Sequence, residues 1–209
     1  MGQIKNIIFD LGGVIINLDI PKTIQEFNKL SPKSFEVIYN QLQQSPIFDQ
    51  FDKGQITERD FLDALKEALD NKLTDAQLLF AWNAMLLDFP KHRLDMLQEL
   101  KSSYRLFLLS NTNETHVLEF ENILSLAHGH KNLESFFEKV YYSCRVNKRK
   151  PDVDIFEMVL QENALKPEET LFIDDSPQHV EGALKTGLKA VLLDKNKEVG
   201  DLLKELHLI

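Results

Sequence analysis

The sequence is short of cysteine, of long apolar runs and of positive charge. Cys144 is the single cysteine among 209 residues, which excludes an internal disulfide and a multi-cysteine zinc site. No apolar run approaches the ~20 residues of a membrane-spanning helix, and the chain reaches Asp10 too early for a secretory signal peptide. The 24 basic residues are outnumbered by 33 acidic ones, which argues against tight binding to nucleic acid. We therefore expect a cytoplasmic protein, monomeric or weakly dimeric, with neither nucleic acid nor membrane as a partner.

Short apolar runs predict the strands of a parallel sheet. Five runs lack the in–out alternation of half-exposed strands, so each has the pattern of a strand buried on both faces. They lie at residues 5–10, 106–109, 140–142, 170–173 and 189–193. Helical periodicity at residues 90–102, 154–162 and 177–186 completes the alternation of strands and helices. The pattern predicts an α/β fold with a doubly wound parallel sheet and right-handed crossovers.

The region after the first predicted strand has a different pattern, with helical periodicity and no clear strand. Thr57 and Thr74 are suitable N-terminal capping residues for two of its helices. Residues 48–54 are expected to form a turn, and Trp82 is expected to pack inside this region. The helices are predicted at residues 23–30, 32–44, 57–70 and 74–87. We therefore predict a Rossmann-like core of residues 1–17 and 90–209, with residues 18–89 inserted as a helical cap.

Polar side chains follow three of the predicted strands. Asp10, Ser110 and the pair Asp174–Asp175 would converge, because ligands of open α/β sheets bind at the carboxyl ends of the strands. Carboxylates placed together repel by ~4 kcal/mol per pair at 4 Å and an effective dielectric constant near 20. A divalent cation removes this repulsion, and all-oxygen ligands favour Mg²⁺ over zinc. A metal beside a carboxylate suits attack of that carboxylate on a phosphate ester.

Four short motifs carry a family resemblance. FDLGGV at 9–14, LLSNT at 108–112, KPD at 150–152 and FIDDS at 172–176 resemble, in order and spacing, the motifs of the haloacid dehalogenase superfamily. The resemblance covers essentially the whole chain, and the helical insert resembles the first-type cap of that superfamily. RKP at 149–151, together with Trp82 and FDKGQIT at 51–57 in the cap, is most similar to the branch containing bacterial α-D-glucose-1-phosphate phosphatase.

The resemblance implies a Mg²⁺ site at the strand ends. Asp10 would be both the nucleophile and a metal ligand. The backbone carbonyl of Gly12 would be a second ligand. Asp175 would bind the metal directly, and Asp174 would help directly or through water.

The resemblance also implies a phosphate site beside the metal. Ser110 would donate its hydroxyl to the phosphate, with the Asn111 amide nearby. Backbone N–H groups of Leu11 and Gly12 would line the phosphate pocket. Lys150 would neutralise charge between the nucleophile and the phosphate. Catalysis would therefore depend on Asp10, Ser110 and Lys150.

Gly12 departs from the family pattern. The superfamily's phosphatases usually carry a second aspartate at this position as general acid and base, and its loss typically costs about 10²–10⁴-fold in rate. Asn113, His116, a cap residue or a bound water could replace it. Alternatively, the leaving group needs little protonation, as for the anomeric oxygen of a sugar 1-phosphate, which is more acidic than an ordinary alcohol. In the third alternative, the protein is a weak enzyme or a binder.

Each motif also has a purely structural interpretation. Asp10 could be a turn residue, and Ser110 could cap the following helix. The pair at 174–175 could stabilise a helix N-terminus, and the basic run at 148–150 could be a solvated surface. The combination of all four motifs in one order favours the catalytic interpretation.

The sequence thus predicts a Mg²⁺-dependent phosphatase for small phosphorylated metabolites, acting through an aspartyl-phosphate. Sugar phosphates such as an anomeric sugar 1-phosphate are the expected substrates. Two alternatives stay open. One is a 2-haloacid dehalogenase, whose chemistry needs no metal and leaves the pair Asp174–Asp175 unexplained. The other is a metabolite-binding protein with a weakened site.

Overall fold

The computed structural model describes residues 3–30, 35, 46–69 and 72–209. Its strands, in chain order, are β1 (Asn6–Phe9), β2 (Arg105–Ser110), β3 (Lys139–Tyr142), β4 (Thr170–Asp174) and β5 (Lys189–Leu192). Its α-helices are α1 (Ile20–Leu30), α3 (Ile47–Asp52), α4 (Glu58–Ala68), α5 (Asp75–Asn83), α6 (Lys91–Leu100), α7 (Glu114–His128), α8 (Ser143–Val146), α9 (Val153–Glu162), α10 (Pro177–Leu184) and α11 (Val199–Glu205).

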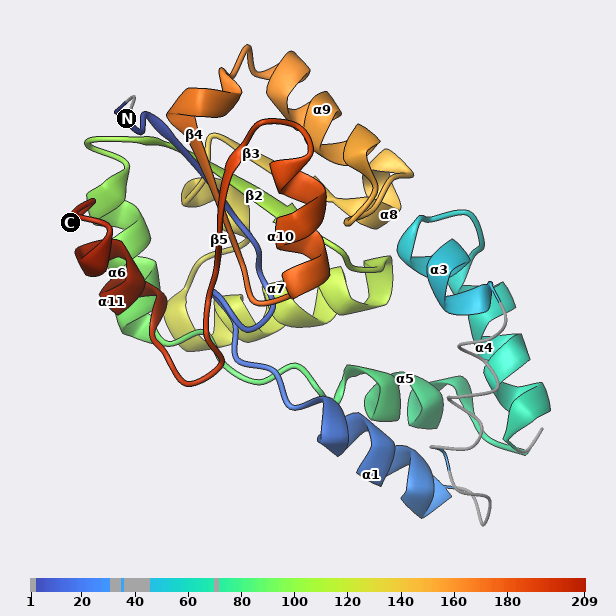
Figure 1. Cartoon of the computed structure of the whole chain (residues 1–209). Coiled ribbons are helices and arrows are strands. Elements are labelled where there is room, and N and C mark those ends of the chain that lie inside the picture. The colour runs from blue at the N-terminus through green and yellow to red at the C-terminus, as the bar shows by residue number, and fades with distance from the viewer. Residues whose placement is uncertain (1–2, 31–34, 36–45, 70–71) are drawn as a thin grey trace.

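The five strands form one parallel sheet in the order β3-β2-β1-β4-β5 (Figure 1). Side chains alternate between its two faces. Phe9 and Leu108 pack in one cluster with α6, α7 and α11, whereas Ile8 and Phe172 pack on the other face with α9 and α10. Both faces are therefore buried, which explains why the strand sequences are continuously apolar. The predicted doubly wound α/β fold is confirmed.

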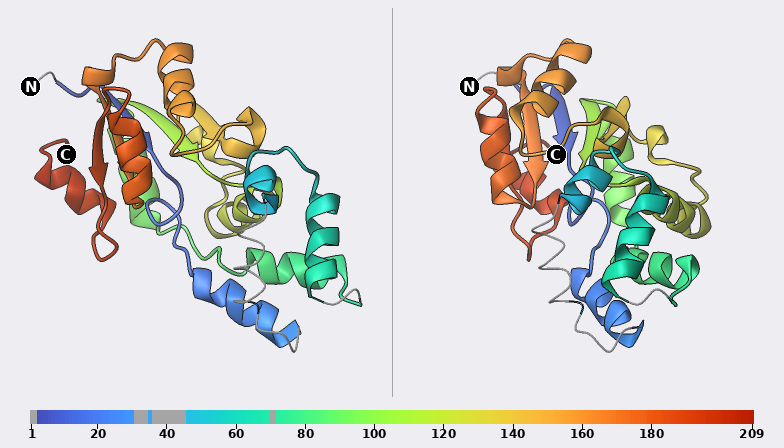
Figure 2. Two further views of the ribbon diagram at one scale, coloured as in Figure 1. Left: turned by 45° about the vertical axis from the view of Figure 1, so that its right-hand side comes forward. Right: turned by 90° about the vertical axis from the view of Figure 1, so that its right-hand side faces the viewer.

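Helices α1, α3, α4 and α5 pack beside the sheet around their own aromatic cluster (Figure 2). Thr57 and Thr74 cap α4 and α5, and each side chain accepts a hydrogen bond from a backbone N–H of the first turn, as predicted. The cluster is centred on Phe27, Phe51, Phe61, Leu65 and Trp82. This cluster makes the four helices a distinct unit, although the division at residues 17/18 and 89/90 stays a prediction.

Two extended linkers join the helical unit to the sheet. Asn17 donates its backbone N–H to the Asp88 carbonyl over 2.9 Å, and Leu87 donates to the Asn17 carbonyl over 3.1 Å. The Asn17 side-chain amide also donates to the Asp88 carboxylate over 3.0 Å. Because the linkers are bonded to each other, the chain leaves and re-enters the sheet domain at one place.

The sequence predicts a turn over residues 48–54, but only residues 53–54 form one, and the prediction is wrong for residues 48–52. Residues 47–52 form helix α3, because Phe48 and Phe51, three positions apart, both pack against Phe61 of α4. Lys53 ends the helix, and Gly54 follows at φ +64°. A side chain at Gly54 would meet the backbone carbonyl of Cys144 in α8, so this glycine permits close contact between α3 and the core.

Other boundaries differ more modestly from expectation. Helix α5 ends at Asn83 rather than near residue 87, because the following segment enters the linker. Helices α7, α8 and α11 have no predicted counterpart. The predicted helix at 32–44 lies outside the described residues, apart from position 35.

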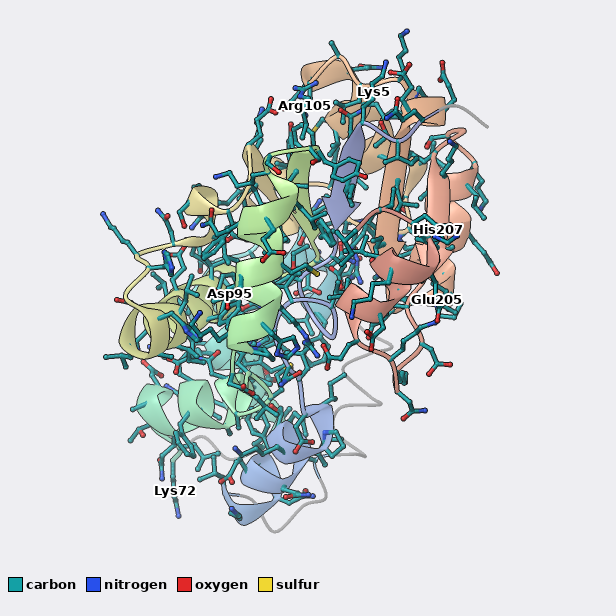
Figure 3. All side chains as sticks on the ribbon, turned by 90° about the vertical axis from the view of Figure 1, so that its left-hand side faces the viewer. Lys5, Lys72, Asp95, Arg105, Glu205 and His207 are labelled. Atoms are coloured by element: carbon teal, nitrogen blue, oxygen red, sulfur yellow. The ribbon has the colours of Figure 1, made fainter. Side chains whose placement is uncertain are left out.

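The carboxyl ends of the strands face the helical cap. Lys5 and Arg105, which flank the beginnings of β1 and β2, lie at the opposite end of the molecule from Lys72 in the cap (Figure 3). Among the helices of the described residues, none is both long and apolar enough to cross a bilayer. The strand ends and the cap together enclose the region where the predicted site residues meet.

Candidate active site

Three buried charged residues meet where β1 and β4 end. These neighbouring strands lie at the point where the strand order reverses, which is where ligands bind in open α/β sheets. Lys150 places its Nζ 2.6 Å from Asp10 Oδ1 and 2.6 Å from Asp174 Oδ2. Its side chain has no solvent exposure. The structure thus brings together Asp10, Lys150 and Asp174, as the sequence predicted.

The three charged groups shift one another's pKa values. Burial, together with repulsion from Asp174, outweighs Lys150 and raises the pKa of Asp10 to about 6. Burial also disfavours the charge on Asp174, but Lys150 and His179 outweigh it and lower the pKa of Asp174 to about 2. Burial opposes the charge on Lys150 too, yet the two aspartates raise its pKa. Lys150 and Asp174 therefore form an ion pair in which both groups are charged. A further cation would stabilise the ionised form of Asp10, whose pKa is raised.

Asn111 fixes the backbone from which Lys150 projects. Its side-chain NH₂ donates to the Lys150 carbonyl over 2.8 Å, and its carbonyl oxygen accepts from the Lys150 N–H over 2.9 Å. The next peptide bond, Lys150–Pro151, is cis. With both ends of its amide bonded in this way, Asn111 positions Lys150. Its side-chain contact with phosphate stays a prediction.

The residues at these strand ends fit a divalent cation. Carboxylate oxygens of Asp10, Asp174 and Asp175 lie within 4.8 Å of one another. Gly13, at φ +71°, makes room for this cluster, because a Cβ there would lie 2.5 Å from Asp175 Oδ2. Among the described residues, no donor is bonded to the Gly12 carbonyl. Oxygen ligands suit Mg²⁺, which proteins hold through one or two carboxylates together with water and substrate phosphate.

Asp174 already has partners for both of its oxygens. Oδ1 accepts from the Ser176 N–H over 2.8 Å, and His179 Nδ1 lies 3.0 Å from both oxygens. Oδ2 also accepts from Lys150. These bonds suit a residue that orients its neighbours better than one that ligates a metal directly. Asp10 and Asp175 are therefore the freer carboxylates for a cation.

A cavity of about 310 Å³ opens over these carboxylates. Ser110, 3% exposed at the end of β2, lines it together with the backbone turn of Leu11 and Gly12. The helical cap contributes Trp82, whose ring stacks on His116 with the ring centroids 5.0 Å apart. The cavity is thus polar at the sheet end and aromatic at the cap end, which suits a small molecule that carries an anionic group.

A residue of the cap occupies the space beside Gly12. A Cβ built on Gly12 would lie 2.6 Å from Leu18 Cδ1. Leu18 belongs to the first linker and also lines the cavity. Glycine at position 12 offers no acid or base to the cavity, and a larger side chain there would require Leu18 to move.

Sequence reasoning gave no role in the site to three residues, Asp52, His179 and Arg149. Asp52, at the end of α3, lines it from the cap. His179 bonds to Asp174 from the first turn of α10, and its spacing after the DDS motif was a usable signal. Arg149 bonds to Asp49 of α3 over 2.9 Å. Lys53, which follows α3 in the cap, does not line the cavity. Its ammonium group pairs with Asp49 and Asp152.

Comparison with known proteins agrees with this geometry. A family model described as haloacid dehalogenase-like hydrolase matches residues 4–187. The chain belongs to this hydrolase family. It is 30% identical, over 85% of its length and 86% of the relative's, to a D-ribitol-5-phosphate phosphatase from Bacteroides thetaiotaomicron. This relative supports the predicted phosphatase branch of the family.

Two solved structures of haloacid dehalogenase-like proteins resemble the chain closely. One is a family enzyme from Bacteroides thetaiotaomicron in complex with magnesium and inorganic phosphate. It is 35% identical with a TM-score of 0.85, over 95% of this chain and 98% of the other. The second, a family hydrolase from Porphyromonas gingivalis, is 34% identical with a TM-score of 0.86, over 98% of each chain. The family fold and the hydrolase class are therefore established.

Proposed function

We propose that this hydrolase is a Mg²⁺-dependent phosphatase of small phosphorylated sugars or polyols, with Asp10 as the nucleophile. The arrangement of Asp10, Lys150 and Asp175 under the cap is the observation that carries this proposal. A carboxylate can attack phosphorus only if the mutual repulsion of the two anions is screened. Lys150 supplies one fixed positive charge, and a Mg²⁺ ion, like that bound to the related enzyme from Bacteroides thetaiotaomicron, would supply the rest.

In this proposal the residues around Asp10 have separate tasks. Asp10, Asp175 and the Gly12 carbonyl hold the cation, and Asp174 fixes Lys150. Ser110 donates its hydroxyl to the phosphate, and Leu11 and Gly12 contribute backbone N–H groups. Asp10 Oδ attacks phosphorus, the alcohol departs, and water then hydrolyses the aspartyl-phosphate. Exclusion of bulk water by the cap strengthens each of these electrostatic contacts.

The size of the cavity and the curated relative favour small substrates with several hydroxyl groups. A space of about 310 Å³ lies at the small end of the usual range for ligand sites. The relative from Bacteroides thetaiotaomicron is named for an alditol phosphate. If no other residue replaces the acid missing at Gly12, a sugar 1-phosphate is favoured within this class, because its anomeric oxygen leaves with less protonation than an ordinary alcohol.

A phosphate-release assay with Mg²⁺ tests the proposal. The substrates are glucose 1-phosphate, glucose 6-phosphate and ribitol 5-phosphate, each with the wild-type protein and with Asp10→Asn. We expect release that requires both Mg²⁺ and Asp10, with glucose 1-phosphate turned over faster than glucose 6-phosphate. Activity retained in full by Asp10→Asn would refute the catalytic assignment, and a clear preference for glucose 6-phosphate would refute the leaving-group argument alone.

Two other measurements, of halide release and of ligand binding, separate the two alternatives. A 2-haloacid dehalogenase would release fluoride or chloride from 2-haloacids in the presence of EDTA. A binding protein would retain a phosphorylated sugar without releasing phosphate. Halide release without metal, or binding without turnover, would replace the phosphatase proposal.

A further inference from the structure

The cavity under the cap has few groups able to exchange a proton. Among the described residues, the titratable side chains that line it are Asp10, Asp52, His116, Asp175 and His179. Asp10 and Asp175 belong to the proposed nucleophile and metal site, and His179 is bonded to Asp174. Two side chains, Asp52 and His116, are left without an assigned task.

His116 is not a suitable proton donor for a substrate. Its Nδ1 lies 3.3 Å from Asn113 Nδ2, and its Nε2 lies 3.4 Å from the Trp82 carbonyl. With these two partners we assign the His116 ring as neutral, with its single N–H on Nε2 and directed at the Trp82 carbonyl. Burial lowers the pKa of His116 to about 4, so the ring stays neutral near pH 7. Both ring nitrogens are thus engaged, Nδ1 with Asn113 and Nε2 with the Trp82 carbonyl.

Asp52 has a different environment, because it projects from the cap toward the core. Asn113 is the N-cap residue of α7, and its side-chain oxygen accepts from the His116 N–H over 3.1 Å. This N-cap hydrogen bond fixes the orientation of the Asn113 side-chain amide. Asn113 Nδ2 is thereby directed at Asp52 Oδ1, 3.4 Å away. The carboxyl group of Asp52 is held at the cavity by a rigid element of the core.

The surroundings of Asp52 favour retention of its proton. Burial, reinforced by Asp49 on the same helix, outweighs the opposing effects of Arg149 and Asn113, and raises the pKa of Asp52. Arg149 Nη1 lies 3.9 Å from Asp52 Oδ2, which is too far for a hydrogen bond. The Cys144 thiol of α8 is the other titratable neighbour. A carboxyl group in this setting can donate a proton at a higher pH than an ordinary aspartate.

We propose that Asp52 is the general acid and base that the chain lacks at position 12, and that it reaches the substrate from the cap. The inference rests on the proposed phosphatase function. It places the proton donor on the cap side of the cavity, whereas Asp10 lies at the end of β1. In an in-line displacement the alcohol departs from the side of phosphorus away from the attacking oxygen. The cap therefore contributes a reacting group as well as a lid.

The proton balance closes over the two steps. When Asp10 Oδ attacks phosphorus, an O–P bond forms and the ester P–O bond breaks. The departing oxygen keeps the electron pair and takes the proton of the Asp52 carboxyl, so the product is a neutral alcohol. The Asp52 carboxylate then accepts a proton from the water that attacks the aspartyl-phosphate. Release of phosphate restores the Asp10 carboxylate and the protonated Asp52.

The leaving group provides a direct test. A primary alcohol needs a proton as it departs, p-nitrophenolate needs none, and an anomeric oxygen lies between them. The ratio kcat/KM reports the step in which the alcohol leaves. We would measure it for Asp52→Asn with ribitol 5-phosphate, glucose 6-phosphate, glucose 1-phosphate and p-nitrophenyl phosphate. Asp49→Asn is the matched control, since Asp49 lies on the same helix and contacts Arg149 but does not line the cavity.

Asp52→Asn should lower kcat/KM by about 100-fold for the primary phosphate esters and by less than about threefold for p-nitrophenyl phosphate. The loss for glucose 1-phosphate should fall between the two. Asp49→Asn, which removes the exposed pair with Arg149, should change kcat/KM for every substrate by the same factor, of at most about fivefold. An equal loss on all four substrates, no loss on any, or the same pattern in Asp49→Asn would overturn the inference.

Two further measurements distinguish a catalytic role of Asp52 from a structural one. Asp52→Glu keeps the carboxylic acid and should regain part of the activity on the primary esters, which a merely structural role would not predict. The pH profile of wild-type kcat/KM should fall on the alkaline side for the primary esters and not for p-nitrophenyl phosphate. Wild-type activity that requires Asp10, with no effect at Asp52, would refute this inference and leave the proposed function intact.

Discussion

Arg149 and Lys150 are consecutive in the chain, and each lies between two aspartates, yet their surroundings differ completely. Lys150 is fully buried between Asp10 and Asp174, at 2.6 Å from each. Arg149 is 27% exposed at the boundary with the cap, where it bonds to Asp49 over 2.9 Å. We name these the inner cluster (Asp10, Lys150, Asp174) and the outer cluster (Asp49, Asp52, Arg149).

The contrast shows how solvent decides what a charge cluster can do. In the inner cluster each charge is desolvated, so removal of Lys150 leaves two buried carboxylates without a counter-charge. In the outer cluster water reaches the Arg149–Asp49 pair, and an exposed pair contributes only about 0–1 kcal/mol. The inner cluster can therefore hold a fixed geometry for chemistry. The exposed Arg149–Asp49 pair can break at little cost, so it fixes the cap against the core only weakly.

The largest effect should come from the inner cluster, at the nucleophile. Asp10→Asn removes the attacking oxygen, and we expect kcat to fall by more than about 10³-fold. Removal of Mg²⁺ with EDTA should have an equal effect, which added Mg²⁺ reverses. Phosphate release measures both. Asp49→Asn, in the outer cluster, is the control. A similar fall in kcat in this variant would contradict the proposed difference between the two clusters.

The second largest effect should come from Lys150→Met, and it should appear in the stability of the fold. It leaves Asp10 and Asp174 buried together without their counter-charge, at an expected cost of ~3–5 kcal/mol in the free energy of unfolding. Urea denaturation, monitored by circular dichroism, measures this cost. Arg149→Met is the matched substitution one residue away and should cost no more than ~1 kcal/mol. Equal destabilisation by the two variants would contradict the assigned difference in burial.

The affinity for Mg²⁺ should depend on pH through the inner cluster. Burial raises the pKa of Asp10 to about 6, and only the ionised carboxylate ligates a metal. Affinity should therefore be nearly constant well above pH 6 and should fall, by up to about tenfold per unit, as the pH drops below it. Calorimetric titration with Mg²⁺ between pH 5 and 8 measures this. An affinity independent of pH over that range would remove Asp10 from the ligands.

The smallest effect should come from Arg149→Met on catalysis. Loss of ~1 kcal/mol in docking of the cap corresponds to about a fivefold change in an equilibrium constant. We expect a rise in KM of at most that size, with kcat nearly unchanged, measured by phosphate release. The difference from wild type should shrink as salt is added, because salt screens the exposed pair. A large fall in kcat would show that Arg149 acts on the reaction itself.

The inner cluster was predictable from sequence, because each member follows a buried strand or lies in a contiguous motif. The parallel sheet was predictable for the same reason, since strands buried on both faces are continuously apolar. The outer cluster was not. Asp52 lies in a six-residue helix, α3, that is held by aromatic contacts within the cap, so its position depends on tertiary packing. Likewise, nothing local in the sequence indicates that Leu18 covers Gly12 or that Asn111 bonds to the backbone of Lys150.

The most direct test of the account is to locate the cation. Crystals grown with Mn²⁺ in place of Mg²⁺, together with inorganic phosphate, would show the metal by its anomalous scattering. The account predicts one ion in contact with both Asp10 and Asp175, and a phosphate beside Ser110 and Lys150. Phosphate bound at Ser110 with no ion between the carboxylates at positions 10 and 175 would contradict it.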